Sequence, residues 1–186
     1  MASFGGQSQQ RWGDNTINQN EYLRDFLLTD LSGRVCKSTD GRRKGMLLVV
    51  FFRPSDPVSR AVLPLVQQIA DAYKESGKLT VLALSGEDDV ATRTAAPELG
   101  VSFPILVDYD RYHAMLYGVT AVPALFLAAG DGRVVRRCTG RNGAALNEMS
   151  AKIAVFSEAT AVMIDPDAPM PETPAPALPP APAPAA

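Results

Sequence analysis

The chain has 186 residues, a formal charge of −2 and a hydrophobic fraction of 46%. This length allows one ordinary domain with its own core plus terminal segments, and the small net charge gives no general attraction to nucleic acid or to an anionic membrane. The two cysteines, Cys36 and Cys138, are too few and too far apart for a disulfide framework or a zinc cluster. We predict neither a metal site nor a cofactor.

Both ends of the chain are poor in large aliphatic side chains. Residues 1–20 are polar and lack the basic and apolar segments of a secretory signal, and from Pro166 onward proline and alanine alternate. The longest apolar run, residues 46–52, is much shorter than the roughly 20 residues that cross a bilayer. We therefore predict a soluble, non-transmembrane protein of the cytoplasm or an organelle. It has an N-terminal arm (1–20), one domain (21–157) and an extended Pro/Ala-rich tail (158–186).

Within the domain, short apolar runs alternate with helical patterns. MLLVVFF (46–52) and LTVLALS (79–85) have the composition of buried strands, and residues 57–76 between them have apolar side chains at helical spacing. The later predicted elements are a helix over 87–100 broken near Pro97, a strand over 103–108, a helix over 110–118, a hairpin formed by 124–129 and 133–140, and a helix over 143–156. This order predicts an α/β domain with a mainly parallel sheet that ends in an antiparallel hairpin.

Three segments resemble the thioredoxin superfamily, and within it the AhpC/TSA-like (peroxiredoxin-like) and TlpA-like redoxins. They are FLLTDLSGR (26–34), residues 44–66 and residues 101–140, of which GVTAVPALFL followed by DGRVV is the most specific. The resemblance implies a three-layer fold, with a mixed central sheet and helices on both faces. It also implies a cis bond between Val122 and Pro123.

The stretch FFRPSDPVSRAVLP (51–64) resembles the active-site segment of these redoxins but contains no cysteine. Aligned with TlpA-like proteins, the two redox cysteines are replaced by Asp56 and Ser59. Aligned with peroxiredoxins, the peroxidatic cysteine is replaced by Ala61. Disulfide exchange and peroxide reduction both need a thiolate, so we predict no catalytic residue at this degenerate site.

Ordinary structural roles account for the other polar candidates. Asp56 followed by Pro57 is a favourable helix start, with Asp56 as the N-cap. VDYD (107–110) offers two carboxylates, which are too few for a cation site, and we expect Asp110 to cap the next helix. His113, the only histidine, is expected at the surface or in packing rather than as a base beside Ser59.

The resemblance places Cys36 in an N-terminal hairpin near one sheet edge and Cys138 on the last strand at the opposite edge, so we expect no disulfide between them. Each thiol could still react singly. The resemblance also implies that a partner peptide pairs with the backbone before the cis-proline, which makes Ala121, Val122 and Pro123 candidate partner-binding residues.

The sequence favours a redox-inactive, thioredoxin-fold protein that acts by protein binding and is not an enzyme. On this hypothesis the chain is an accessory or scaffold subunit of a larger assembly, and its partners contact the peptide-binding residues and the two terminal arms. The alternative is an antioxidant or thiol-disulfide oxidoreductase that uses Cys36 or Cys138 with a partner's thiol.

Overall fold

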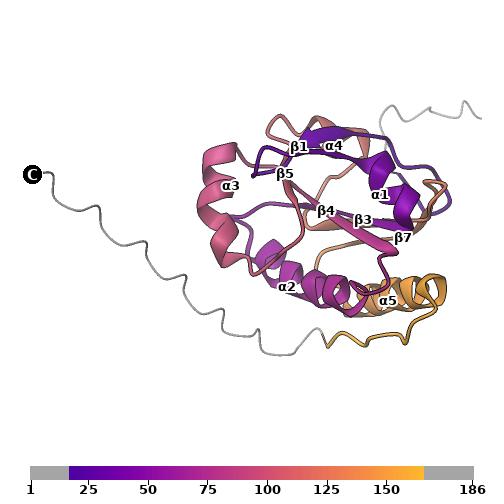
Figure 1. Cartoon of the computed structure of the whole chain (residues 1–186). Helices are drawn as coiled ribbons and strands as arrows, with labels where there is room; N and C mark the ends of the chain where they lie inside the picture. Colours follow the sequence, from indigo (N-terminus) through magenta and orange to yellow (C-terminus); the bar gives the residue numbers. More distant parts are fainter. Residues whose placement is uncertain (1–16, 166–186) are drawn as a thin grey trace, which may run out of the picture.

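The computed structural model describes residues 17–165, so the predictions for residues 1–16 and 166–186 lie outside the described part of the chain (Figure 1). In chain order the elements are β1 (Leu27–Thr29), β2 (Val35–Lys37), α1 (Ser38–Lys44), β3 (Met46–Phe52), α2 (Pro57–Ala72), β4 (Leu79–Ser85), α3 (Asp89–Ala95), the 3₁₀ turn η1 (Ala96–Glu98), β5 (Ile105–Val107), α4 (Tyr112–Leu116), β6 (Ala124–Ala128), β7 (Val134–Thr139) and α5 (Gly143–Ser157).

The central sheet has five strands in the order β5-β4-β3-β6-β7. Strands β3, β4 and β5 are parallel, whereas β6 runs antiparallel to β3 and β7 antiparallel to β6. This is the predicted combination of a parallel part and a closing hairpin. Strands β1 and β2 form a separate antiparallel pair, which touches β5 through a bridge between Asp30 and Leu106.

Strand β3 is buried on both faces because helices cover the sheet from both sides. Alternate residues of β3 belong to two clusters: Met46, Leu48, Val50 and Phe52 face the layer of α2 and α5, and Leu47, Val49 and Phe51 face the opposite layer. The second layer contains α1, α4 and the β1–β2 hairpin (Figure 1). The three-layer thioredoxin-like fold predicted from the resemblance is therefore confirmed.

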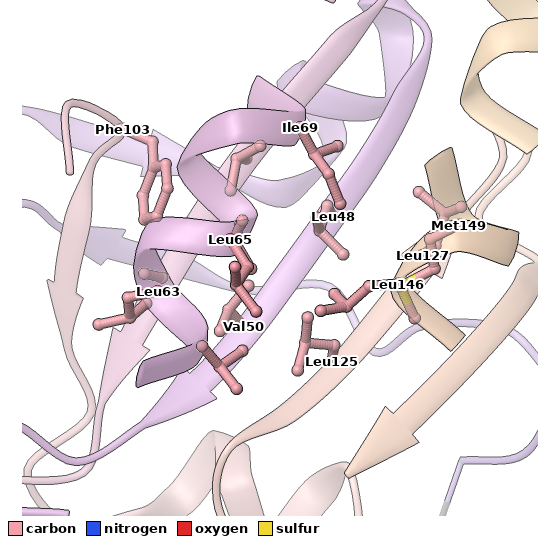
Figure 2. Close-up of a cluster of buried hydrophobic side chains, with 14 of the residues drawn as sticks. Leu48, Val50, Leu63, Leu65, Ile69, Phe103, Leu125, Leu127, Leu146 and Met149 are labelled. Carbon is pink, nitrogen blue, oxygen red and sulfur yellow. The ribbon is translucent and has the colours of Figure 1, made fainter. Parts of the chain in front are cut away.

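Apolar side chains from α2, α5 and all five strands of the central sheet fill the space between the sheet and these two helices. Figure 2 shows Leu65 and Ile69 of α2 directed at Leu48 and Val50 of β3, while Met149 of α5 lies over β6. These residues are at most 3% exposed. Burial of one such side chain stabilises the fold by about 1.5–3 kcal/mol, so this cluster is a main source of stability.

Most of the predicted elements are present, and the differences are local. The helical pattern over 87–100 is divided into α3 and η1 around Pro97, and the strand expected over 103–108 is confined to β5. Helix α1 is not predicted by the sequence because STDGRRK has no apolar stripe. It packs on the sheet through Gly41, where a Cβ atom would press on Leu47 and Thr80.

Two segments outside the regular elements complete the domain. Ile17 is 3% exposed, and its N–H donates to the carbonyl oxygen of Tyr117. At the other end, residues 159–165 run back along α5 in an extended conformation (Figure 1). None of the helices in residues 17–165 is long and apolar enough to cross a membrane.

Candidate functional site

The start of α2 lies at the carboxyl end of β3, where open α/β sheets place their functional sites. The carboxylate of Asp56 accepts a hydrogen bond from the N–H of Ser59 at 2.7 Å, and Pro57 is the first helical residue. The predicted N-cap is therefore confirmed. Ser59 is fully buried, and its hydroxyl accepts from the N–H of Arg53 at 3.3 Å. The start of α2 is thus capped. Its residues Asp56, Ser59 and Ala61 provide no redox nucleophile.

A cleft lies beside this helix start, between the ends of β3 and β4 and the loop before β6. It has a volume of about 170 Å³, and its lining includes Arg53, Gly86, Arg111, Ala121 and Val122. Neither Ala121 nor Val122 lies in a helix or strand, and neither makes a backbone hydrogen bond to another residue of 17–165. Their N–H and C=O groups are therefore available to an extended peptide, as the prediction requires.

The Val122–Pro123 bond is cis, as predicted. Pro123 is buried, and its carbonyl oxygen accepts from the N–H of Gly140. Of the three candidate partner-binding residues, Ala121 and Val122 line the cleft, and Pro123 fixes the direction in which the chain enters β6. Binding of a partner at these residues stays a prediction.

Asp108, a residue to which the sequence analysis gave no role, organises the other side of the cleft. It is 2% exposed, and its carboxylate accepts from the N–H groups of His113 and Ala114 at 3.1 and 2.9 Å. The same carboxylate lies 2.9 Å from Nδ1 of His113. Asp110 accepts only from the N–H of Tyr112, so the expectation that Asp110 caps α4 is wrong: Asp108 satisfies the first turn.

His113 is held in place by this carboxylate and by aromatic neighbours. Its ring is half-buried and meets the ring of Phe26 edge-on, with 5.8 Å between the centroids. The packing role expected for His113 is therefore confirmed. Within residues 17–165, no three His, Cys, Asp or Glu side chains are grouped so that they could hold a metal ion.

Cys138 lies on β7 opposite Leu125 of β6, in the cluster covered by α2 and α5. It is 8% exposed, and burial raises the pKa of its thiol to about 11, although Arg136 and Arg137 partly oppose this effect. A thiol with such a pKa is almost entirely protonated near neutral pH. Cys138 is therefore a poor nucleophile and has little access to a partner.

Cys36 lies on β2 in the hairpin on the other side of the sheet. Its Sγ is 3.9 Å from Oδ2 of Asp30 and 3.8 Å from the carbonyl oxygen of Arg34. Burial and the negative charge of Asp30 raise the pKa of the thiol, whereas the guanidinium of Arg34 lowers it. Both cysteines are free, as expected, because they lie in clusters on opposite faces of the central sheet.

Asp30 connects Cys36 to the strand that leads into the cleft. It bridges to Leu106 of β5, and Asp108, two residues further along, lines the cleft. Cys36 is not a lining residue of the cleft, and its link to β5 runs through Asp30. No sequence pattern indicates this arrangement, because it depends on the contact between the hairpin and β5.

Comparison with known proteins gives consistent matches over this domain. The model of the AhpC/TSA family matches residues 20–137. Thiol-disulfide oxidoreductase ResA of Bacillus thuringiensis (strain Al Hakam) is 28% identical over 116 residues, and ResA of Geobacillus thermodenitrificans (strain NG80-2) is 32% identical over 117 residues. Each match covers 62% of this chain and 66% of the relative, so the chain spans just under two thirds of their length.

Among solved structures, a thiol-disulfide oxidoreductase from Bacteroides fragilis NCTC 9343 superposes with a TM-score of 0.64 at 20% identity. The match covers 72% of this chain and 99% of that protein. At this identity the similarity supports the fold alone.

The names of the sequence relatives correct the function predicted from the sequence. That prediction, a redox-inactive scaffold or binding protein, is wrong, because the matching relatives are named thiol-disulfide oxidoreductases. They support the alternative, a thiol-dependent oxidoreductase. Since the start of α2 has no cysteine, such chemistry within this chain must use Cys36 or Cys138.

Proposed function

The chain belongs to the AhpC/TSA family, and on that basis we propose that it is a thiol-dependent oxidoreductase that exchanges disulfides with a partner protein. Cys36 is its reacting thiol. The sequence relatives support this class of activity, since they are named thiol-disulfide oxidoreductases. The position of Cys36 supports the choice of residue.

The observation that favours Cys36 over Cys138 is its place in the fold. Strand β2 has three residues and pairs only with β1 among the described strands, so a small displacement of the hairpin exposes Sγ. Cys138 lies on a strand of the central sheet under α5, and its exposure requires the loss of core packing. Burial and Asp30 raise the pKa of the Cys36 thiol, and the cation of Arg34 on the same hairpin opposes this effect without cancelling it.

The exchange uses only thiols and needs no cofactor. The Cys36 thiolate attacks one sulfur of the partner's disulfide, so that a Cys36–partner disulfide forms while the other partner sulfur leaves as a thiolate. A small thiolate in solution then attacks the Cys36 sulfur of the mixed disulfide, which releases the second partner sulfur as a thiolate, and a second small thiolate attacks the small-thiol sulfur of the new disulfide, which restores Cys36 and leaves the two small thiols joined as a disulfide. The net result is reduction of the partner's disulfide by two external thiols.

We further propose that the partner binds the cleft through an extended segment that pairs with the free backbone groups of Ala121 and Val122. The hairpin of Cys36 bridges to β5 through Asp30 and Leu106, and Leu106 lies two residues before Asp108 of the cleft lining, so the hairpin and the cleft both adjoin the end of β5. Contacts through the terminal arms stay a prediction, because residues 1–16 and 166–186 lie outside the described part.

The test is the rate at which the full chain reduces a small aromatic disulfide and an oxidised protein, with glutathione as the external thiol. Cys36→Ser is expected to lower both rates to the background of glutathione alone, and Cys138→Ser is the matched control and should leave them within twofold. Equal activity in wild type and Cys36→Ser would refute the assignment. Wild-type rates at background would refute the oxidoreductase itself.

A further inference from the structure

Residues 159–165, here called the strap, lie on the surface formed by α2 and α5 and are held mainly through their backbone. The N–H of Val162 donates to Oη of Tyr73 at 3.3 Å, and its carbonyl oxygen accepts from Oγ of Ser150 at 2.6 Å. Two residues later, the amide group of Asn147 donates to the carbonyl oxygen of Ile164 at 3.0 Å and accepts from its N–H at 2.6 Å. Two side chains of α5 and that of Tyr73, the C-cap of α2, thus pair with alternate residues as a neighbouring strand would.

The side chains of the strap alternate in the same way. Ile164 is 2% exposed and belongs to the core cluster, and Val162 packs against that cluster, whereas Met163 is 75% exposed. An extended segment presents alternate residues to opposite sides, so this is the pattern of a strand with one buried face. Tyr73 and Ser150 are 1% and 0% exposed and bond to each other at 2.8 Å, so the receiving polar groups are fixed before the strap arrives.

Together, Tyr73, Asn147 and Ser150 (the strap site) form a receptor for an extended peptide with aliphatic residues two positions apart. The recognition is by main chain plus two apolar side chains, so it does not require the peptide to belong to the same chain. The structure contains one segment that fits, and every copy of the protein has it. We propose that a second copy of this chain donates its strap to the strap site, giving a dimer with exchanged C-terminal straps.

The connection between α5 and the strap is suited to such an exchange. Glu158, the C-cap of α5, has a left-handed backbone conformation with φ of 56°, which is unfavourable for a residue other than glycine. The next three residues, Ala159 to Ala161, are all exposed. Only the link from Glu158 to Val162 must change its path, while all contacts at the strap site are kept, as in other domain-swapped dimers.

The short link also determines which surfaces meet. Four residues span at most about 14 Å, so the end of α5 in one copy must lie close to the strap site of the other. That helix end is apolar and open to solvent: Val155 is 83% exposed and Phe156 is 44% exposed. An exchanged dimer brings these side chains beside the partner copy, where their exposure decreases. This inference concerns α5 and is independent of the thiol chemistry.

Complementation between two full-length variants tests the proposal. Val162→Asp combined with Ile164→Asp disables the strap but keeps the strap site, and Asn147→Ala weakens the site but keeps the strap. Each variant alone should have the monomer mass of 19.9 kDa by light scattering, and an equimolar mixture of the two variants should give a species of twice that mass. Met163→Asp, added to the Asn147→Ala chain as the matched control, should leave the mixed dimer intact because that side chain faces solvent. A mixture that stays monomeric at a few hundred micromolar would overturn the proposal.

Hydrogen exchange on the wild-type chain gives a second measurement that does not depend on a variant folding. The amides of Val162 and Ile164 should be protected, because both donate to side chains of the strap site. In the Asn147→Ala chain alone the amide of Ile164 loses its acceptor and should lose protection, and it should regain protection when the strap-disabled variant, whose strap site is intact, is added. Absence of protection in the wild type would show that the strap is not seated and would equally overturn the inference.

Discussion

Replacement of Asp30 by Asn is the sharpest test of the environment assigned to Cys36. Three donors, the N–H groups of Ser32 and Arg34 and the hydroxyl of Ser32, all bond to Oδ1 of Asp30, which an asparagine oxygen can replace. The other oxygen, Oδ2, lies 3.9 Å from Sγ of Cys36 and also accepts from the guanidinium of Arg34 at 3.2 and 3.1 Å. The pKa of Asp30 is lowered, chiefly by the hydrogen bond from Ser32, so its carboxylate is charged at neutral pH and opposes a thiolate beside it.

The separation of the two groups gives the size of the effect. Two unit charges 3.9 Å apart repel by about 1 kcal/mol at the dielectric constant of water, and by more in a partly buried site. Removal of about 1 kcal/mol raises the thiolate population about sixfold at a pH below the pKa of the thiol. A less basic thiolate is also a weaker nucleophile, which reduces the gain in reaction rate to about threefold. The expected gain is therefore about threefold.

The assay is the pseudo-first-order rate of Cys36 alkylation by iodoacetamide at pH 7.5, followed by mass spectrometry of the Cys36 peptide. Asp30→Asn should react about threefold faster than wild type. The matched control, Asp40→Asn, removes an exposed carboxylate from the neighbouring α1 and should change the rate little. In every variant the rate should rise with pH as the thiol ionises. An unchanged or slower rate in Asp30→Asn, with unaltered circular dichroism, would refute the electrostatic reasoning.

Three further predictions follow from other parts of the molecule. The pKa of Cys138 is raised from 9.0 to about 11 in the folded protein, so its contribution to stability is complete below pH 9 and is lost by pH 11. In chemical denaturation, the wild type should lose up to about 3 kcal/mol more unfolding free energy over this pH range than Cys138→Ala does. Asp56→Cys combined with Ser59→Cys places a thiol pair at the start of α2, and it should raise disulfide reduction at least tenfold over wild type, whereas no gain would show that the cleft is unsuited to the reaction. Asp108→Ala leaves two N–H groups of α4 without their acceptor and should cost about 2–3 kcal/mol in unfolding free energy, but Asp110→Ala should cost less than about 1 kcal/mol; equal losses would contradict the assigned capping role.

Features determined by local chemistry could be predicted from the sequence. The run MLLVVFF is apolar at every position because both of its faces are covered, and Asp56 with Pro57 marks the first turn of α2 by hydrogen-bonding rules that need no tertiary information. The cis bond before Pro123 was predictable only from the resemblance, since its dipeptide is not distinctive.

Features that depend on contacts between distant segments could not be predicted. Asp108 and Asp110 are equally good capping residues by type, and only the geometry at the end of β5 makes Asp108 the acceptor. Helix α1 has no amphipathic pattern, because it packs through a glycine rather than a row of large side chains. The place of Cys36 beside Asp30 likewise arises from the hairpin, and it decides which thiol is the better candidate.

The complete burial of β3 has a consequence for biosynthesis. Before its covering helices form, MLLVVFF is a seven-residue run without charge or proline, which is the composition of segments that aggregate through intermolecular strand pairing. The flanking sequence counteracts this hazard. Arg42, Arg43 and Lys44 precede the run, and Arg53 and Pro54 follow it directly. Such charged and proline neighbours disfavour pairing between nascent chains, so substitutions among them are expected to reduce the soluble yield before they change the folded protein.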